Sequence, residues 1–146
     1  DEKNRQIRIC MGKRPLPLLI KTEPYPGFPT DLQSPFMAFL ATAQGTSYIE
    51  EQVFEGRFAT AKILEQMGAV IRTEDQRAVI EGHYPLKGAA VNACDLRGGA
   101  ALMVAALAAE GDTFIGECHH IERGYEDICM DMAALGAHIR WVGKDS

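Results

Sequence analysis

Two kinds of charged residue occupy matched positions in this 146-residue chain and could together bind and activate an anionic substrate. Arg57 and Arg123 each stand shortly before an expected helix, and Arg97 falls in the first turn of another. Free amides at helix N-termini favour anions, and arginine adds a permanent charge whose planar fork matches a carboxylate or phosphate. If the three guanidinium groups converge, they form an anion site. The alternative is that each arginine pairs with a neighbouring Asp or Glu on the surface.

Asp31 also allows two interpretations. As the N-cap of the helix that it opens, its carboxylate would accept hydrogen bonds from first-turn amides and need no other role. The preceding segment, Pro26-Gly27-Phe28-Pro29-Thr30, is a stiff turn in which two prolines fix φ. A rigid loop that holds a carboxylate beside arginines suits a general base, and proton removal from a hydroxyl typically contributes about 10²–10⁴ in rate.

Other reactive residues give weaker signals. Cys118, His119 and His120 are adjacent, and neighbouring side chains on a strand point to opposite faces, so we expect no shared metal ion. The Gly98-Gly99 pair lacks the spacing of a dinucleotide fingerprint, and no phosphate-binding lysine loop occurs in the sequence. We therefore expect neither a metal nor a cofactor.

The composition limits the classes of partner. Lys and Arg total 15 against 20 Asp and Glu, a net charge of −5 that argues against nucleic-acid or anionic-membrane binding. The longest apolar run, Ala100–Ala109, is far shorter than the roughly 20 residues that cross a bilayer. The first five residues do not resemble a secretory signal. The cysteines carry no metal or redox spacing, which favours a cytoplasmic protein: Cys10, Cys94, Cys118 and Cys129.

An internal repeat organises the chain. Four ordered matches carry it: Asp31-Leu32 with Asp95-Leu96, Ala43-Gln44-Gly45 with Ala109-Glu110-Gly111, Arg57 with Arg123, and Gly68–Arg72 with Gly136–Arg140. The offset between matches grows from 64 to 66 to 68 residues, as expected when short loops lengthen between equivalent elements. Each copy is therefore expected to form the same α/β unit.

The pattern of apolar residues and turn formers predicts similar elements in both copies. In the first we expect a strand at 18–22, a helix from Asp31 to about Ala43 with Pro35 in its first turn, a strand at 46–53, a helix from Arg57 to Gly68, and strands at 70–72 and 78–81. In the second we expect a strand at 89–93, a helix at 96–109 capped by Asp95, a strand at 113–117, a helix with an apolar stripe from Tyr125 to Leu135, and a last strand at 138–142.

The fold class is therefore mixed α/β, with two consecutive units in one partial domain. Residues 1–20 would be the tail of a preceding unit, around Ile7–Met11, and a linking strand; residues 21–85 form unit one and residues 86–146 unit two. Such units bury their apolar faces against one another, so a closed domain is expected to need three or more. Two units would expose a face, and self-association is one way to cover it.

Four segments resemble a known family, the UDP-N-acetylglucosamine enolpyruvyl transferases, also called 1-carboxyvinyltransferases. They are Pro26–Gln33, Val53–Phe58, Asp95–Arg97 and His120–Tyr125. The resemblance runs from about Lys21 to the C-terminus. It implies an inside-out α/β barrel, or α/β prism, built from repeated βαβαββ units with helices inside and sheets outside, and this chain would hold two of the three units of one domain.

The implied reaction moves the enolpyruvyl group of phosphoenolpyruvate to the 3-hydroxyl of UDP-N-acetylglucosamine and releases phosphate, the first committed step of peptidoglycan synthesis. The resemblance assigns roles to six residues: Asp31 as sugar contact and base, Val53 as a backbone contact to the UDP-sugar, Arg97 and Arg123 as contacts to phosphoenolpyruvate, and Arg57 and Asp95 as residues that organise the closed site. No cofactor is implied.

The chain also departs from the family. Gly56 stands where the family has Asn, and Cys94 where Thr is common. The family's mobile loop with its reactive Cys or Asp, and a Lys-Asn pair, have no match here, so the missing N-terminal domain is an expected partner and the chain alone is expected to be inactive. Two alternatives stay open: a non-catalytic module that binds an anionic sugar nucleotide or only assembles, and a fragment of the shikimate-pathway enolpyruvyl transferase.

Overall fold

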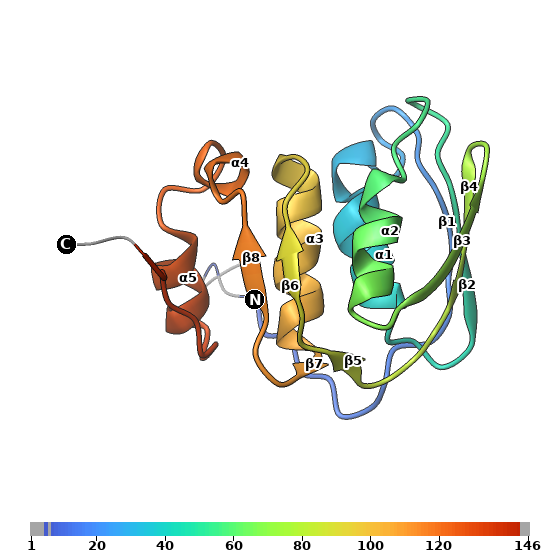
Figure 1. Cartoon of the computed structure of the whole chain (residues 1–146). Helices are drawn as coiled ribbons and strands as arrows, with labels where there is room; N and C mark the ends of the chain where they lie inside the picture. Colours follow the sequence, from blue (N-terminus) through green and yellow to red (C-terminus); the bar gives the residue numbers. More distant parts are fainter. Residues whose placement is uncertain (1–4, 6, 144–146) are drawn as a thin grey trace.

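The computed structural model describes residue 5 and residues 7–143, which form a mixed α/β fold (Figure 1). Unit one contains β1 (Leu19–Lys21), the 3₁₀ helix η1 (Thr30–Leu32), α1 (Gln33–Leu40), β2 (Thr46–Glu50), α2 (Ala59–Gln66), β3 (Val70–Glu74) and β4 (Arg77–Glu81). Unit two contains β5 (Leu86–Lys87), β6 (Ala90–Asn92), α3 (Leu96–Leu107), β7 (Ala109–Glu110), β8 (Phe114–Gly116), α4 (His119–Glu122) and α5 (Ile128–Ala134).

The strands of unit one form a four-stranded sheet in the order β1-β2-β4-β3. β1 runs parallel to β2, and β4 runs antiparallel to both of its neighbours. Alternate residues are buried, including Ile49 and Ile80, which are both fully inaccessible. This period of two is what a sheet with one covered face requires. Figure 1 shows α1 and α2 against that face, with β6, β8 and α5 on the side away from this sheet.

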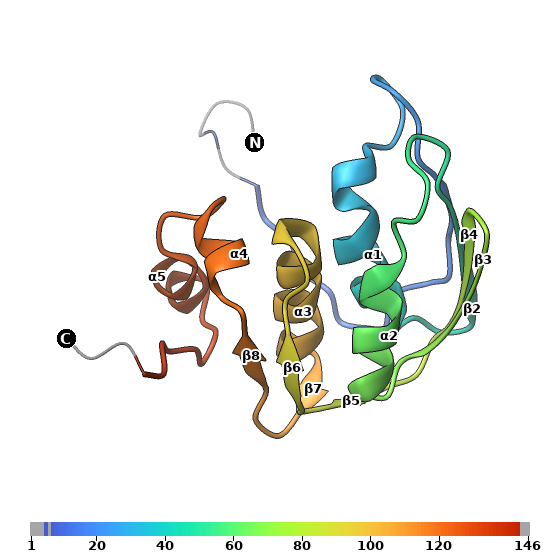
Figure 2. The same cartoon turned by 45° about the horizontal axis from the view of Figure 1, so that its top comes forward.

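The core lies where the helices of the two units meet. α1 packs on α3, and the buried residues there include Met37, Leu40, Leu102 and Ala105. In unit two, β6 pairs with β8 in parallel, as β1 pairs with β2 in unit one. The N-terminal ends of α1, α2 and α3 lie at one end of the molecule, together with α4 (Figures 1 and 2). Because these ends share one side, residues before each helix can meet there.

The sequence repeat is also a structural repeat. Gly68 and Gly136 follow α2 and α5 with φ values of 85° and 98°, a conformation that glycine adopts without strain. The next amide closes the helix in the same way in both units, from Ala69 to the Leu64 carbonyl and from Ala137 to the Met132 carbonyl, 68 residues apart in each case. The prediction of a mixed α/β fold is confirmed, whereas the division into two units with boundaries at residues 20 and 85 stays a prediction.

Several predicted elements were wrong in detail. Asp31 is not an N-cap: it lies inside η1, and Leu32 precedes α1 without a side-chain cap. The first helix ends at Leu40 rather than near Ala43, because the amides of Thr42 and Ala43 bond to carbonyls three residues back, Phe39 and Leu40, instead of four. The helix expected from Tyr125 begins only at Ile128, where Asp127 accepts a hydrogen bond from the Met130 amide.

Two further corrections concern unit two. His119 and His120 lie on α4 rather than on a strand, with Cys118 at its N-cap, so the argument from opposite strand faces does not hold. Residues 138–142 were predicted as a strand but are irregular. In unit one the equivalent strand, β3, pairs only with β4. At the offset of 68 residues a counterpart of β4 would begin near residue 145, outside the described residues.

Candidate active site

The carboxylate of Asp31 lies between two arginines that come from different units. Arg97 Nε donates a 2.6 Å hydrogen bond to Asp31 Oδ1, and Arg57 Nη1 lies 3.6 Å from the same oxygen. The Asp31 side chain is 66% exposed, whereas those of Arg57 and Arg97 are 23% and 38% exposed. The Asp31 carboxylate is therefore open to solvent, whereas the two guanidinium groups next to it are partly buried.

Besides the contact with Asp31, two further contacts hold the Arg57 side chain. Its Nη1 donates to Thr30 Oγ1 at 3.1 Å, and its guanidinium carbon lies 3.9 Å from the centre of the Phe54 ring. Stacking on an aromatic face and a hydroxyl acceptor both restrict a long side chain that would otherwise be mobile. Because Thr30 immediately precedes Asp31, the same contact holds the loop that carries the carboxylate.

Behind Thr30 lies a buried carboxylate that sequence reasoning missed. Glu51 is 1% exposed, and both of its oxygens are occupied. Oε1 accepts from Thr22 Oγ1 at 2.8 Å and from the amides of Val53 and Phe54, while Oε2 accepts from Thr30 Oγ1 at 2.8 Å. Glu51 thus ties the end of β2 to the loop before η1. The signal in the sequence was its place two residues after Ile49, which puts residue 51 on the same, buried face of an extended chain.

Burial disfavours the charged form of Glu51, but the hydrogen bonds from Thr22, the Phe54 amide, Thr30 and the Val53 amide outweigh it, and the pKa of Glu51 lies below its ordinary value. The carboxylate is therefore ionised at neutral pH. A buried negative charge that accepts four hydrogen bonds is a rigid anchor, because releasing any donor leaves part of that charge unsatisfied.

The remaining predicted site residues have separate positions. Asp95 is the N-cap of α3, and its Oδ1 accepts the Gly98 amide at 2.6 Å, which confirms its capping role. Val53 directs its amide at Glu51 and is half-buried. Arg123 is exposed at the end of α4, and within residues 7–143 its guanidinium makes no hydrogen bond or ion pair.

The backbone near Arg123 nonetheless lies at the site. A Cβ at the next residue, Gly124, would approach Leu96 Cδ1 to 2.6 Å, so this loop packs on the first residue of α3, next to Arg97. The structure therefore joins Asp31, Arg57 and Arg97 directly. It places the Arg123 backbone at the same end of the molecule without bringing its side chain into contact with Asp31.

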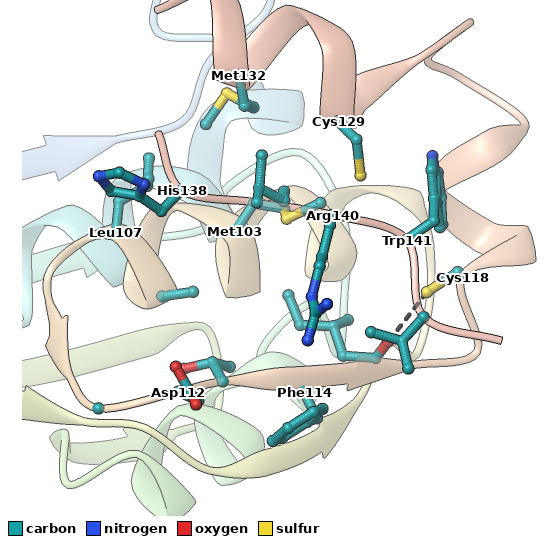
Figure 3. A pocket seen from close by; sticks show the side chains of 16 residues that line it. Met103, Leu107, Asp112, Phe114, Cys118, Cys129, Met132, His138, Arg140 and Trp141 are labelled. Atoms are coloured by element: carbon teal, nitrogen blue, oxygen red, sulfur yellow. Dashed lines mark hydrogen bonds between the residues drawn. The ribbon is translucent and has the colours of Figure 1, made fainter. Parts of the chain in front are cut away.

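The described residues contain neither a metal centre nor a membrane-spanning helix that would point to a different kind of function. Among residues 7–143 no group of three His, Cys, Asp or Glu side chains is arranged to hold a metal ion. No helix in the described part of the chain is both long and apolar enough to cross a membrane. The cavity drawn in Figure 3 lies elsewhere, between α3, β8, α5 and residues 138–142.

The fold places one acid and two arginines at the same end of its helices. Comparison with known proteins identifies the class of protein that has this fold. The family described as EPSP synthase (3-phosphoshikimate 1-carboxyvinyltransferase) matches residues 1–132. The chain therefore belongs to this family of enolpyruvyl transferases. Its fold is also that of the enolpyruvyl transferase NikO from Streptomyces tendae, with a TM-score of 0.78 and 36% identity over 87% of this chain and 30% of that one.

Similar relatives carry a more particular name. A protein named UDP-N-acetylglucosamine 1-carboxyvinyltransferase from Desulfofundulus thermocisternus is 49% identical over 138 residues, which is 94% of this chain and 57% of that protein. UDP-N-acetylglucosamine 1-carboxyvinyltransferase 2 from Carboxydothermus hydrogenoformans is 49% identical over 142 residues, 97% of this chain and 34% of its own length.

A solved EPSP synthase from Acinetobacter baumannii shares the fold, with a TM-score of 0.62 and 22% identity over 78% of this chain and 27% of that one. The chain spans 57% of the length of the first relative and about a third of the length of the second.

Proposed function

We propose that this chain supplies one part of the active site of an enzyme that transfers the enolpyruvyl group of phosphoenolpyruvate to the 3-hydroxyl of UDP-N-acetylglucosamine and releases phosphate, at the start of peptidoglycan synthesis. The observation that carries the proposal is the exposed Asp31 carboxylate between the guanidinium groups of Arg57 and Arg97. This reaction needs both elements, because a hydroxyl proton has to leave and an anion of high charge has to be held.

The chemistry assigns a role to each part. A bond forms between the sugar oxygen and C2 of phosphoenolpyruvate, the bond from C2 to the phosphate oxygen breaks, and the hydroxyl proton is lost. Asp31 accepts that proton. Arg97 leaves Asp31 for the incoming carboxylate or phosphate, since a guanidinium fork matches either group. Arg57, which Thr30 and Phe54 hold in place, keeps the loop and its carboxylate positioned.

Three further residues complete the proposed site. Arg123 joins Arg97 on phosphoenolpyruvate, and its exposed side chain beside the start of α3 leaves it able to turn toward a ligand. Asp95 organises the site by fixing the first turn of α3, which carries Arg97. Val53 contacts the UDP-sugar through its backbone. Together, cations that stabilise the charge of the departing phosphate supply the electrostatic part of catalysis.

The acceptor is proposed from the relatives rather than from the fold. Proteins that are 49% identical over nearly the whole chain carry the name of the UDP-sugar enzyme, whereas the EPSP synthase structure at 22% identity supports the shared fold alone. The remainder of the active site, including the domain opposite Asp31, would be a partner outside this chain. The proposal also places the protein in the cytoplasm, where exposed thiols such as Cys10 and Cys94 stay reduced.

A chimera tests the proposal. This chain would replace the matching 142 residues of the Carboxydothermus relative, and the product would be tested with each acceptor in the presence of phosphoenolpyruvate. We expect UDP-N-acetylglucosamine to raise its melting temperature and to elicit phosphate release, and shikimate 3-phosphate to do neither. A folded chimera that releases phosphate with shikimate 3-phosphate, or with neither acceptor, would contradict the proposal.

A further inference from the structure

A single buried carboxylate joins the two segments that the proposed function assigns to the acceptor sugar. Glu51 Oε1 accepts from the Val53 amide at 2.9 Å, and Val53 is the proposed backbone contact to the UDP-sugar. Glu51 Oε2 accepts from Thr30 Oγ1 at 2.8 Å, and Thr30 directly precedes Asp31, the proposed base. One side chain therefore sets the separation between the place where the sugar is held and the carboxylate that takes its proton.

The other surroundings of this carboxylate leave it no access to a ligand. Glu51 is 1% exposed, and its remaining partners are the Phe54 amide at 3.0 Å and Thr22 Oγ1 at 2.8 Å. Thr22 is fully buried, and its hydroxyl in turn accepts from the Gln52 amide at 2.9 Å. Glu51 can therefore affect the reaction only through the residues that it holds.

The direction of one hydroxyl extends the network to an arginine. A threonine hydroxyl has a single proton and two lone pairs. Thr30 gives its proton to Glu51, so a lone pair is left for Arg57, whose Nη1 donates to Thr30 Oγ1 at 3.1 Å. The same Nη1 lies 3.6 Å from Asp31 Oδ1. The base is therefore held by two routes that both begin at Glu51, one along the main chain and one through the Arg57 guanidinium.

This role requires a permanent acceptor at position 51 rather than any polar side chain. All four partners of Glu51 are donors, and a neutral amide would present a donor of its own to one of them. Although burial raises the pKa of Glu51, the four hydrogen bonds hold that pKa below its ordinary value. The side chain thus stays ionised at neutral pH and accepts only.

We propose that Glu51 is a positioning residue for the acceptor: it fixes the Asp31 carboxylate relative to the Val53 backbone, so that the base meets the 3-hydroxyl of the bound UDP-sugar. The inference rests on the proposed function, from which it takes both residue roles. The proposed contacts to phosphoenolpyruvate, Arg97 and Arg123, lie outside this network, because they come from α3 and the end of α4. Loss of Glu51 should therefore impair acceptor binding and the rate, and leave the binding of phosphoenolpyruvate as it was.

Steady-state kinetics of the chimera with Glu51→Gln test this proposal. Three donors face Oε1 and one faces Oε2, so glutamine places its carbonyl oxygen at Oε1 and its amide group against the Thr30 hydroxyl. We expect kcat to fall by about tenfold or more, because a displacement of about 1 Å at a reacting group can cost about 10²-fold. The KM for UDP-N-acetylglucosamine should rise several-fold, and the KM for phosphoenolpyruvate should stay at its wild-type value.

Substitutions at Thr30 separate positioning from a loss of stability. Thr30→Val removes the hydroxyl that joins Glu51 to Arg57 and should reproduce the kinetic changes of Glu51→Gln. Thr30→Ser keeps the hydroxyl and should recover the rate that Thr30→Val loses. Glu65→Gln, the same change at an exposed position of α2, is the matched control and should leave all three constants at their wild-type values. A general loss of folded enzyme would instead lower the apparent kcat alone.

A second measurement needs no turnover. In the 146-residue chain, ¹⁵N relaxation of the Arg57 Nε–H group reports how rigidly the guanidinium is held on the ps–ns timescale. We expect this group to gain mobility in Glu51→Gln and Thr30→Val, and to stay rigid in Thr30→Ser and Glu65→Gln.

Two results would overturn the proposal. One is an active chimera in which Glu51→Gln and Thr30→Val leave kcat unchanged or alter the two KM values to the same extent. The other is an Arg57 side chain that stays as rigid in both variants as in the wild type. A folded chimera that releases no phosphate with UDP-N-acetylglucosamine contradicts the proposed function instead, and the relaxation measurement then decides whether Glu51 holds Arg57.

Discussion

The carboxylate of Glu51 connects single-residue chemistry to the geometry of the site. Two of its four hydrogen bonds hold Thr22 and Thr30, and Thr30 in turn accepts a hydrogen bond from Arg57. Asp31 follows Thr30 in the chain, so the position of the proposed base depends on a buried acid that touches no substrate. This arrangement separates two functions between two acids: Glu51 is buried and fixed, while Asp31 is exposed and able to exchange partners.

At this scale we predict that Glu51→Gln lowers the free energy of unfolding by about 1–3 kcal/mol at neutral pH, because the amide nitrogen cannot accept the hydrogen bonds that one carboxylate oxygen accepted. Urea denaturation followed by circular dichroism measures this change. Glu55→Gln, an exposed position nearby, is the matched control and should change stability by no more than about 0.5 kcal/mol.

The contribution of Glu51 to folding stability depends on pH with a defined sign. The pKa of Glu51 is lower in the folded chain than its ordinary value of 4.5, so the folded state binds the proton less well than the unfolded state does. The contribution of Glu51 is therefore fully present above the unfolded pKa and is lost as the pH falls through the folded pKa. The stability gap between wild type and Glu51→Gln should narrow on acidification. A gap that widens below pH 4.5 would contradict this assignment.

At the scale of elements, the two aspartates that the repeat relates have different roles. Asp95 caps α3, whereas Asp31 lies in η1 and contacts arginines instead of a helix amide. We predict that Asp95→Ala lowers the free energy of unfolding by about 1 kcal/mol, the usual cost of a lost N-cap. Asp31→Ala should cost less, since exposed ion pairs contribute only about 0–1 kcal/mol. Equal losses in chemical denaturation, or a larger loss for Asp31→Ala, would refute the distinction.

The same pair shows what the sequence could predict. A repeat of Asp-Leu was enough to place both aspartates at the starts of helices, and Gly68 and Gly136 were enough to end the helices that precede residues 70 and 138. The sequence could not show that η1 takes the place of a first helical turn at Asp31. Whether an aspartate caps a helix or turns to a distant arginine depends on Arg97, 66 residues further along the chain.

Residues 138–142 show a second limit. Their pattern matches that of β3, and the turn that introduces them is the same. A strand nevertheless requires a neighbour, and the neighbour of β3 is β4. Local sequence therefore predicted the path of this segment but not its hydrogen bonding. Glu51 was missed for a related reason: its burial depends on Thr22 and Thr30, which lie on other segments.

For the whole molecule, the arrangement of the helices explains how the site is assembled. Equivalent units put their helix starts at one end, which brings together Arg57 from unit one and Arg97 from unit two around Asp31. Within residues 7–143, no strand pairs with β8 on the side where β4 pairs with β2 in unit one. The curated relatives extend well beyond this chain, so in the proposed enzyme the site meets further parts of the fold.

The most direct test of the central claim is phosphate release by the chimera with the Carboxydothermus relative, before and after Asp31→Asn. The substitution keeps the shape of the side chain and removes its ability to accept a proton, so turnover should fall by about 10²-fold or more. Asp75→Asn, the same change at an exposed turn, should leave turnover intact. Undiminished phosphate release by the Asp31→Asn chimera, with a normal melting temperature, would show that this carboxylate is not the base.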